Sequence, residues 1–169
     1  GEAPVRTGVA PPTICPYETF TCSDGPFFIG AGNDRQFRAL ALALDAPELV
    51  DDPRFLTNPD RLENSPALRA VLGGLVGDIR RDELAERLRE AGVPSGAVND
   101  VGEALSMPQV LHREMVVERD GYRSVGIPIK LSDTSGSVRF GPRPHGADTE
   151  SVLAELGLDR AAHSEPDGR

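Results

Sequence analysis

The sequence predicts an α+β fold with short, mostly antiparallel strands and amphipathic helices. Two Asp-Gly pairs, at 24–25 and 120–121, separate runs of strand-forming residues and predict β-hairpins. Several segments between them place apolar residues three or four positions apart, as one face of a helix requires. Helices and hairpins follow one another in mixed order instead of as repeated βαβ units, which favours α+β over a parallel α/β fold.

The first hairpin is expected to lead directly into a helix. Residues 17–22 alternate aromatic and polar side chains, and the apolar run 27–30 supplies the second strand. Asn33 then predicts an N-cap, because Gln36 stands three residues later, as in a capping box. The helix is expected over 34–44, where the apolar side chains share one face.

A longer helical pattern begins at Asn58. This residue predicts an N-cap, because Pro59 follows at the first helical position. An apolar stripe continues over 62–76. Pro66 and the pair Gly73-Gly74 weaken this helix and are expected to divide it.

Further elements complete the domain. Residues 81–91 form an amphipathic pattern, and Gly92 predicts its C-terminal stop. The other expected elements, in chain order, are a turn at 47–50, a strand within 93–98, a helix from Asn99 to 105, strands at 115–119 and 122–125, an edge strand at 128–131, a Pro/Gly crossing at 141–144 and a helix at 149–156.

This pattern predicts four parts of the chain. Residues 1–16 are rich in Pro and Gly without periodicity and predict an irregular lead-in. Residues 17–131 are expected to form a small two-layer α+β domain, and 132–158 a return segment with a final helix. The polar stretch 159–169 predicts a disordered tail.

Composition excludes several classes of protein. The 18 Lys+Arg against 27 Asp+Glu give a net charge of −9, which repels nucleic acid and anionic lipid. The sequence has no apolar run long enough to predict a membrane span. Cys15 and Cys22 lack metal-ligand spacing and predict free thiols in a reducing cytoplasm. His112, His145 and His163 match no ligand motif, so no metal site is expected.

One segment has the composition of an anion-binding turn. Residues 29–34 read Ile-Gly-Ala-Gly-Asn-Asp, between an expected strand and an expected helix. The segment lacks the residue spacing of a dinucleotide-binding fingerprint and that of a phosphate-binding loop. This favours a tight turn with a structural role. Residue spacing alone identifies no catalytic nucleophile paired with a general base. It therefore predicts only an acidic α+β domain without an assigned activity.

Longer motifs carry a family resemblance. The chain resembles the family III CoA-transferases, the CaiB/BaiF group that includes formyl-CoA and carnitine CoA-transferases. The matching motifs, in order, are CPYETF at 15–20, SDG at 23–25, GNDRQF at 32–37, PELVDDPRFLTN at 47–58 with Arg61 and Asn64, AGVPSGAVND at 91–100, PQV at 108–110 with Arg113 and Met115, and GIPIKLS at 126–132.

The resemblance implies a reaction and a larger assembly. In such enzymes an Asp of the first half attacks the acyl-CoA thioester, giving a mixed anhydride and then an aspartyl-CoA thioester from which CoA passes to a carboxylate. This chain resembles only the second half, so it is expected to hold no catalytic residue and to be inactive alone. The implied partners are acyl-CoA and carboxylate substrates, the absent N-terminal half and a second copy in an interlocked homodimer. The CoA thioester is a substrate, and no tightly bound cofactor is implied.

The resemblance also suggests which residues lie near substrate. An active-site cover is expected from Gly8 in the lead-in and from Gly30, Gly32, Asn33 and Asp34 in the glycine-rich turn. The segment 8–13 has prolines where formyl-CoA transferase has glycines, which favours a stiff cover over a mobile lid.

Two alternatives remain open from the sequence. The related α-methylacyl-CoA racemases use a Glu in the equivalent turn, but Asn33 cannot carry a proton, so the racemase ranks second. A GEHT motif common in relatives appears as Gly146-Ala147-Asp148-Thr149, without its Glu and His. A noncatalytic dimerisation or binding domain is the other alternative, and the chain could be a truncated or a natural split subunit.

Overall fold

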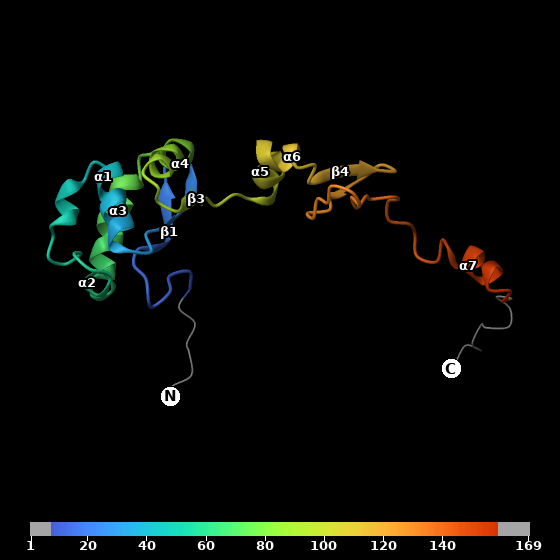
Figure 1. Ribbon diagram of the computed structural model, residues 1–169, viewed down its shortest axis with the longest axis horizontal. Coiled ribbons are helices and arrows are strands. Elements are labelled where there is room, and N and C mark those ends of the chain that lie inside the picture. The colour runs from blue at the N-terminus through green and yellow to red at the C-terminus, as the bar shows by residue number, and fades with distance from the viewer. Residues whose placement is uncertain (1–7, 159–169) are drawn as a thin grey trace, which may run out of the picture. The chain divides into compact units, whose positions relative to one another are not determined.

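The computed structural model describes residues 8–158, which divide into two units between Asp100 and Val101 (Figure 1). This division falls inside the range 17–131 that the sequence assigns to one domain, and that boundary stays a prediction for the complete protein. The expected tail at 159–169 and the first seven residues of the lead-in lie outside the described residues.

A three-stranded antiparallel sheet organises the first unit. The strands are β1 (Tyr17–Cys22), β2 (Gly25–Gly30) and β3 (Ser95–Ala97), in the order β1-β2-β3. Cys22 pairs with Gly25 and Tyr17 with Gly30, so the predicted first hairpin is confirmed. Strand β2 begins at Gly25, earlier than expected, because the φ of +141° at this glycine brings it into register with Cys22.

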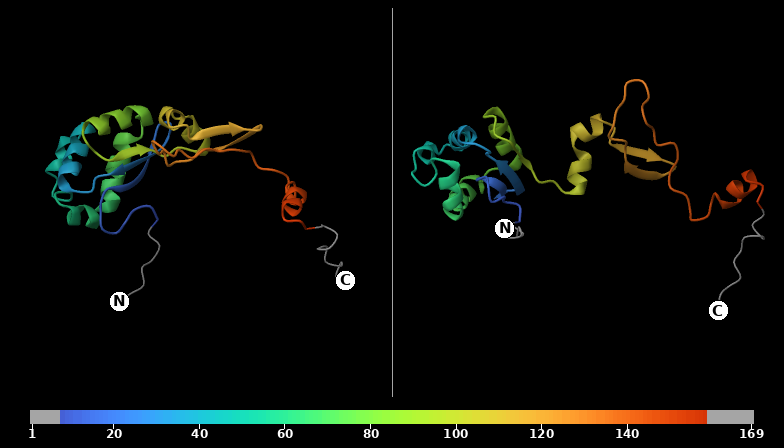
Figure 2. Two further views of the ribbon diagram at one scale, coloured as in Figure 1. Left: turned by 45° about the vertical axis from the view of Figure 1, so that its right-hand side comes forward. Right: turned by 60° about the horizontal axis from the view of Figure 1, so that its bottom comes forward.

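Helices cover one face of this sheet (Figures 1 and 2). Helix α3 packs against β1, and α4 packs against β2 and β3, which confirms a two-layer α+β arrangement. Alternate residues of β1 face the helices, as a half-buried strand requires. The helices are α1 (Asp34–Ala43), the 3₁₀ turn η1 (Pro47–Val50), α2 (Asn58–Glu63), α3 (Ser65–Val76) and α4 (Arg81–Glu90).

The core of the first unit is almost entirely apolar. Phe27 and Ile29 of the sheet and Phe55 from the loop before α2 are completely buried, as are the inward leucines of α3 and α4. Two charged side chains are buried with them, Glu18 of β1 and Arg61 of α2. Buried charges require partners, so these two residues mark the places where the unit is not simply hydrophobic.

The predicted helix ends are confirmed at α1 and α4. The Asn33 side-chain oxygen accepts a hydrogen bond from the Gln36 N–H at 2.9 Å, which satisfies one of the unpaired donors at the start of α1. Gly92 follows the end of α4 with a φ of +69°, the left-handed conformation expected of a glycine stop.

The N-cap prediction at Asn58 is wrong by one residue. Thr57 caps α2, because its Oγ1 accepts from the Asp60 N–H at 3.4 Å while Asp60 Oδ2 accepts from the Thr57 N–H at 3.0 Å. This reciprocal capping box leaves the Asn58 side chain available for other contacts. The expected division falls between α2 and α3, where Pro66 stands in the first turn of α3, and Gly73-Gly74 lies within α3.

The capping box at α2 predicts a pH-dependent stability. Replacing Thr57 with alanine is expected to lower the free energy of unfolding by about 1 kcal/mol at neutral pH. Hydrogen bonds from the Thr57 hydroxyl and backbone N–H hold the pKa of Asp60 below its usual value. This carboxylate therefore stabilises the fold above its unfolded pKa, about 3.8, and the contribution is lost as the pH falls through the lower folded pKa. Urea unfolding of wild type and Asp60→Asn should differ at pH 7 and converge below about pH 4. A difference that persists in acid would contradict this assignment.

The second unit contains a hairpin and three short helices. Its elements are α5 (Val101–Ser106), α6 (Pro108–His112), β4 (Val116–Arg119), β5 (Tyr122–Val125) and α7 (Thr149–Glu155). Asp120 and Gly121 both have positive φ, at 54° and 72°, which confirms the predicted Asp-Gly turn of a two-residue hairpin.

The expected edge strand at 128–131 is wrong. The chain leaves the hairpin at Gly126, whose N–H donates to the Met115 carbonyl at 2.9 Å. The Pro128 carbonyl then accepts from Arg113 Nη2 at 3.1 Å and is bound by a side chain instead of a neighbouring strand. Proline also lacks the N–H that a strand ladder needs.

The second unit buries no large apolar side chain among residues 101–158. Even side chains of its strands and helices are open, with Val125 63% and Val101 76% exposed. The other exposed apolar residues of this unit include Met107, Leu111, Tyr122, Ile129, Leu131, Phe140, Val152, Leu156 and Leu158. A unit of this kind has little hydrophobic stabilisation of its own. In the part of the chain that the structure describes, no helix is long and apolar enough to cross a bilayer.

Candidate functional site

The glycine-rich turn between β2 and α1 uses its backbone donors internally. The Gly30 N–H donates to the Pro94 carbonyl and the Ala31 N–H to the Pro16 carbonyl, each at 2.9 Å. The Gly32 N–H donates to the Gln36 side chain at 2.9 Å. These three groups are therefore engaged in holding the turn, as the structural interpretation of this motif expects.

Gly30 is required by close packing. A Cβ atom at this position would lie 3.0 Å from Tyr17 Cε2 and 3.1 Å from Phe28 Cε1. The two rings pack edge to face, with centroids 4.9 Å apart. Glycine at this position thus allows an aromatic pair on the exposed side of the sheet.

A buried guanidinium lies behind the same turn. Arg61 of α2 is 0% exposed and donates from Nη2 to Asp34 Oδ1 at 2.8 Å. Its Nε donates to the Cys15 carbonyl at 2.7 Å and its Nη1 to the Phe55 carbonyl at 3.1 Å. The guanidinium carbon also lies 4.4 Å from the centroid of the Phe37 ring. One side chain therefore joins the lead-in, the turn and the loop before α2, using the planar fork of donors that only arginine provides.

The lead-in is fixed by a second side chain of α2. Asn58 Oδ1 accepts from the Cys15 N–H at 3.0 Å, and Asn58 Nδ2 donates to the Thr13 carbonyl at 2.9 Å. Further from this anchor, Gly8 has a φ of +74° and open space around it. Residues 8–16 of the lead-in are thus without helix or strand, and the chain is held in place at 13–15.

A hollow of about 530 Å³ lies between the lead-in and the α2–α3 helices. The buried Glu18 carboxylate lines it and forms an ion pair with Arg69 of α3. The remaining wall is mainly apolar, with Ser65 adding a hydroxyl. The lining residues from the lead-in include Ala10, Pro11, Pro12 and Ile14, and those from the helices include Leu62 and Pro66.

The thiols of Cys15, in the lead-in, and Cys22, at the end of β1, are buried, and both are expected to be unreactive. Burial and the neighbouring Glu18 raise the pKa of the Cys15 thiol, while burial and Asp24 raise the pKa of the Cys22 thiol. The thiolate is the nucleophilic form, so alkylation of the native chain at pH 7.5 should be much slower than alkylation in urea. Peptide mass spectrometry would assign each rate, with Cys22→Ser isolating Cys15. Labelling at equal rates in both conditions would contradict the buried positions.

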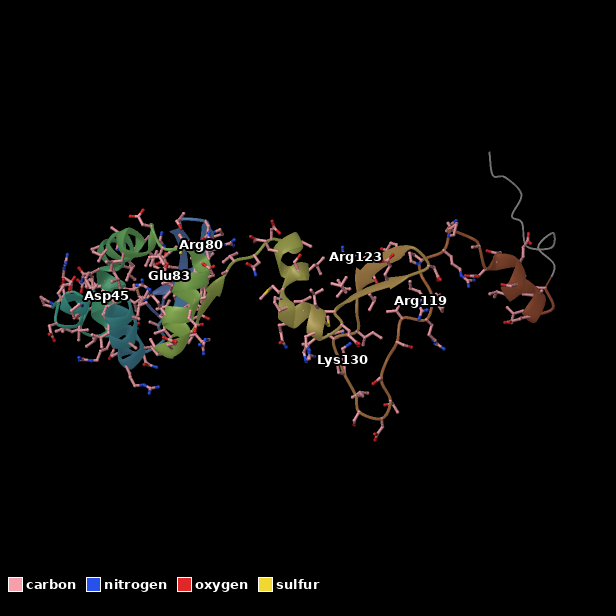
Figure 3. All side chains as sticks on the ribbon, turned by 90° about the horizontal axis from the view of Figure 1, so that it is seen from above. Asp45, Arg80, Glu83, Arg119, Arg123 and Lys130 are labelled. Carbon is pink, nitrogen blue, oxygen red and sulfur yellow. The ribbon has the colours of Figure 1, made fainter. Side chains whose placement is uncertain are left out.

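Cations of the second unit are distributed along its hairpin. Arg119 and Arg123 come from β4 and β5, and Lys130 comes from the following segment (Figure 3). Lys130 lies 3.9 Å from a Glu114 carboxylate oxygen, and Glu118 stands opposite Arg123 in the strand register. Acidic neighbours thus offset Arg123 and Lys130, whereas Arg119 Nε donates to the Val138 carbonyl. Residues 8–158 also contain no group of three His, Cys, Asp or Glu side chains that could hold a metal ion.

Four of the five expected site residues, Gly30, Gly32, Asn33 and Asp34, lie within the segment from the end of β2 to the start of α1. Gly8 lies on the lead-in, and the role of these residues as a cover stays a prediction. Sequence reasoning assigned no function to Asn58 beyond a cap and none to Arg61. A signal for Arg61 was available, because it stands 7 and 11 positions before the buried leucines 68 and 72 and so falls in phase with their apolar stripe.

Comparison with known proteins agrees with this fold. The model of CoA-transferase family III matches residues 1–149. The chain is 39% identical over 132 residues to acetyl-CoA:oxalate CoA-transferase of Acetobacter aceti, covering 78% of this chain and 34% of that protein. It is 33% identical over 135 residues to human succinyl-CoA:glutarate CoA-transferase, covering 80% of this chain and 30% of that protein. The chain thus spans about a third of the length of these relatives.

Solved structures have a similar fold. A CaiB/BaiF family protein from Brucella suis matches 92% of this chain and 41% of its own, with a TM-score of 0.82 and 36% identity. Rv3272 from Mycobacterium tuberculosis matches 81% of this chain and 38% of its own, with a TM-score of 0.71 and 20% identity, which supports the fold alone. From the motifs, the fold and the family match together, this chain belongs to CoA-transferase family III.

Proposed function

We propose that this chain is the C-terminal portion of an enzyme that transfers CoA from an acyl-CoA thioester to a carboxylic acid. The match of the family model to residues 1–149 carries this proposal. The relatives named above are CoA-transferases for oxalate and glutarate, both dicarboxylates, so a dicarboxylate is the proposed acceptor. The chain covers about a third of these relatives, and we assign the nucleophilic Asp to a part of the enzyme outside these residues.

Three aspartates of the first unit support this assignment because each already accepts hydrogen bonds from an arginine. Asp34 binds Arg61, and Asp24 Oδ1 accepts from the Arg81 N–H at 2.8 Å. Hydrogen bonds from Arg54 lower the pKa of Asp52. A nucleophilic carboxylate is held with one oxygen aimed at the substrate carbonyl, whereas at least one oxygen of each of these groups already accepts a hydrogen bond from an arginine of the chain.

In the proposed reaction this chain contributes a cover over the intermediate. A mixed anhydride and an aspartyl-CoA thioester both hydrolyse if water reaches them, so transfer requires that water be excluded. We assign this role to Gly8 of the lead-in and to Gly30, Gly32, Asn33 and Asp34 of the turn. Prolines in the lead-in and the internal hydrogen bonds of the turn favour a stiff cover.

The exposed apolar side chains of the second unit support a partner surface. We propose that residues 101–158 pack against the N-terminal half of the enzyme or a second copy in a homodimer. Burial of this apolar area would supply the hydrophobic stabilisation that the unit lacks in isolation.

The proposal is tested on the complete enzyme. Incubation with acetyl-CoA or succinyl-CoA and a panel of carboxylates, oxalate and glutarate included, should yield a new acyl-CoA by liquid chromatography and mass spectrometry. Hydroxylamine should trap an enzyme-bound acyl group, and the 169-residue chain alone should give no product. Exchange of the α-proton of a 2-methylacyl-CoA without transfer would instead indicate a racemase, which the capping role of Asn33 disfavours. Absence of both activities would leave a noncatalytic binding domain.

A further inference from the structure

The start of α2 holds the lead-in through hydrogen bonds at two successive sites. Asn58 bonds both the Cys15 N–H and the Thr13 carbonyl, at 3.0 and 2.9 Å, and so binds the segment much as a neighbouring strand would. Arg61, one turn further along α2, donates from Nε to the Cys15 carbonyl at 2.7 Å. These contacts join residues 43 to 46 positions apart in the chain, so they place the lead-in on the folded unit.

The lead-in depends on these contacts because its own structure is irregular. Residues 8–16 form turns and bends, without helix or strand. The same segment forms one wall of the 530 Å³ hollow, and Leu62 and Ser65, just beyond Asn58 and Arg61, form the facing wall. The two side chains therefore fix the distance between the lead-in and the helices that it faces.

Resting on the proposed function, we infer that Asn58 and Arg61 are positioning residues that hold the lead-in as the cover and thereby keep water from the intermediate. The step at risk is hydrolysis of the aspartyl-CoA thioester. Water attacks the thioester carbonyl, a C–O bond forms and the C–S bond breaks. One proton of the water goes to the CoA sulfur and the other to solvent, and the products are the aspartate carboxylate and the CoA thiol. A displaced lead-in would admit this water without changing any group that reacts.

The test compares Asn58, the first residue of α2, with Asn64, which follows the end of α2, in the complete enzyme. Asn58→Leu removes both bonds to the lead-in, and Asn58→Asp keeps the acceptor for Cys15 but loses the donor to Thr13. Asn64→Leu is the matched control, because Asn64 also donates to backbone carbonyls, those of Asp60 at 2.9 Å and Arg54 at 3.3 Å, but does not touch the lead-in. Free CoA and transferred acyl-CoA are measured together, which gives the ratio of hydrolysis to transfer.

The expected ratio rises roughly three- to tenfold in Asn58→Leu, the range that loss of one or two net hydrogen bonds gives. It should rise less in Asn58→Asp and stay at the wild-type value in Asn64→Leu. A purely structural role would lower the amount of active enzyme without moving this ratio. An equal ratio in Asn58→Leu and Asn64→Leu would overturn the inference.

Hydrogen exchange gives a readout that does not depend on activity. The Cys15 amide, which donates to Asn58, should exchange faster in Asn58→Leu than in wild type or Asn64→Leu. Unchanged exchange would show that Asn58 does not hold the lead-in and would also overturn the inference. If the wild-type enzyme transfers no CoA, the proposed function fails, whereas the exchange result still decides whether the anchor exists.

Discussion

Replacing Arg61 with alanine is expected to lower the free energy of unfolding by about 3–5 kcal/mol, because it leaves two buried carbonyls without a donor and a cavity in the core. The substitution leaves the buried Cys15 and Phe55 carbonyls without their donor and opens space beside the Phe37 ring. Urea titration of the 169-residue chain, followed by helical circular dichroism, would measure the loss.

Two further variants make this result specific to the guanidinium. Arg61→Lys keeps the charge but offers a single ammonium, which cannot reach three acceptors that lie on different segments, so it should recover only part of the stability. Arg89→Ala removes an exposed arginine that pairs with Glu86 and should leave the unfolding curve nearly unchanged. A wild-type unfolding curve for Arg61→Ala would contradict the assigned role of this network.

The second large effect is expected in the hydrogen exchange of residues 101–158. In the isolated chain the amides of β4 and β5 should exchange with an opening free energy close to zero, because an isolated two-stranded hairpin is at best marginally stable in water. Amides of α1 and α4, which cover a buried core, should be strongly protected in the same sample. Exchange measured by mass spectrometry on one preparation compares the two units directly.

The complete enzyme supplies the control for this experiment. In the complete enzyme the exposed Val125, Ile129 and Phe140 should pack against the N-terminal half or a second copy. This packing should slow exchange in β4 and β5 by several orders of magnitude, since each kcal/mol of added stability is about a fivefold change. Equal protection of β4 and α1 in the isolated chain would show that the second unit is stable by itself. That result would remove the main support for the partner surface.

Local signals in the sequence predicted much of the fold. Both Asp-Gly hairpins, the Asn33 cap of α1 and the Gly92 stop of α4 are found as expected. Each depends on residues within a few positions of one another, so the bonds that decide it are encoded together. The motif series likewise predicted the family, because it extends over most of the chain.

Two local expectations failed because other contacts competed for the same groups. Asn58 was expected to cap α2, but the preceding residue, Thr57, is the N-cap because it forms a capping box with Asp60. The edge strand at 128–131 has apolar residues typical of a strand, but Arg113 binds the Pro128 carbonyl. In each case the residue type was compatible with both outcomes, and only the geometry of its neighbours selected one.

Residue spacing was therefore enough to predict most elements of the first unit, the caps at Asn33 and Gly92, and the family to which the chain belongs. Tertiary structure decided what Asn58 and Arg61 do, because their partners in the lead-in lie 43 to 46 positions away. It also decided that Asp34 serves as an acceptor for a buried guanidinium. Spacing along a helix or strand places a side chain on a face, but the groups that meet it there are set by how distant segments pack.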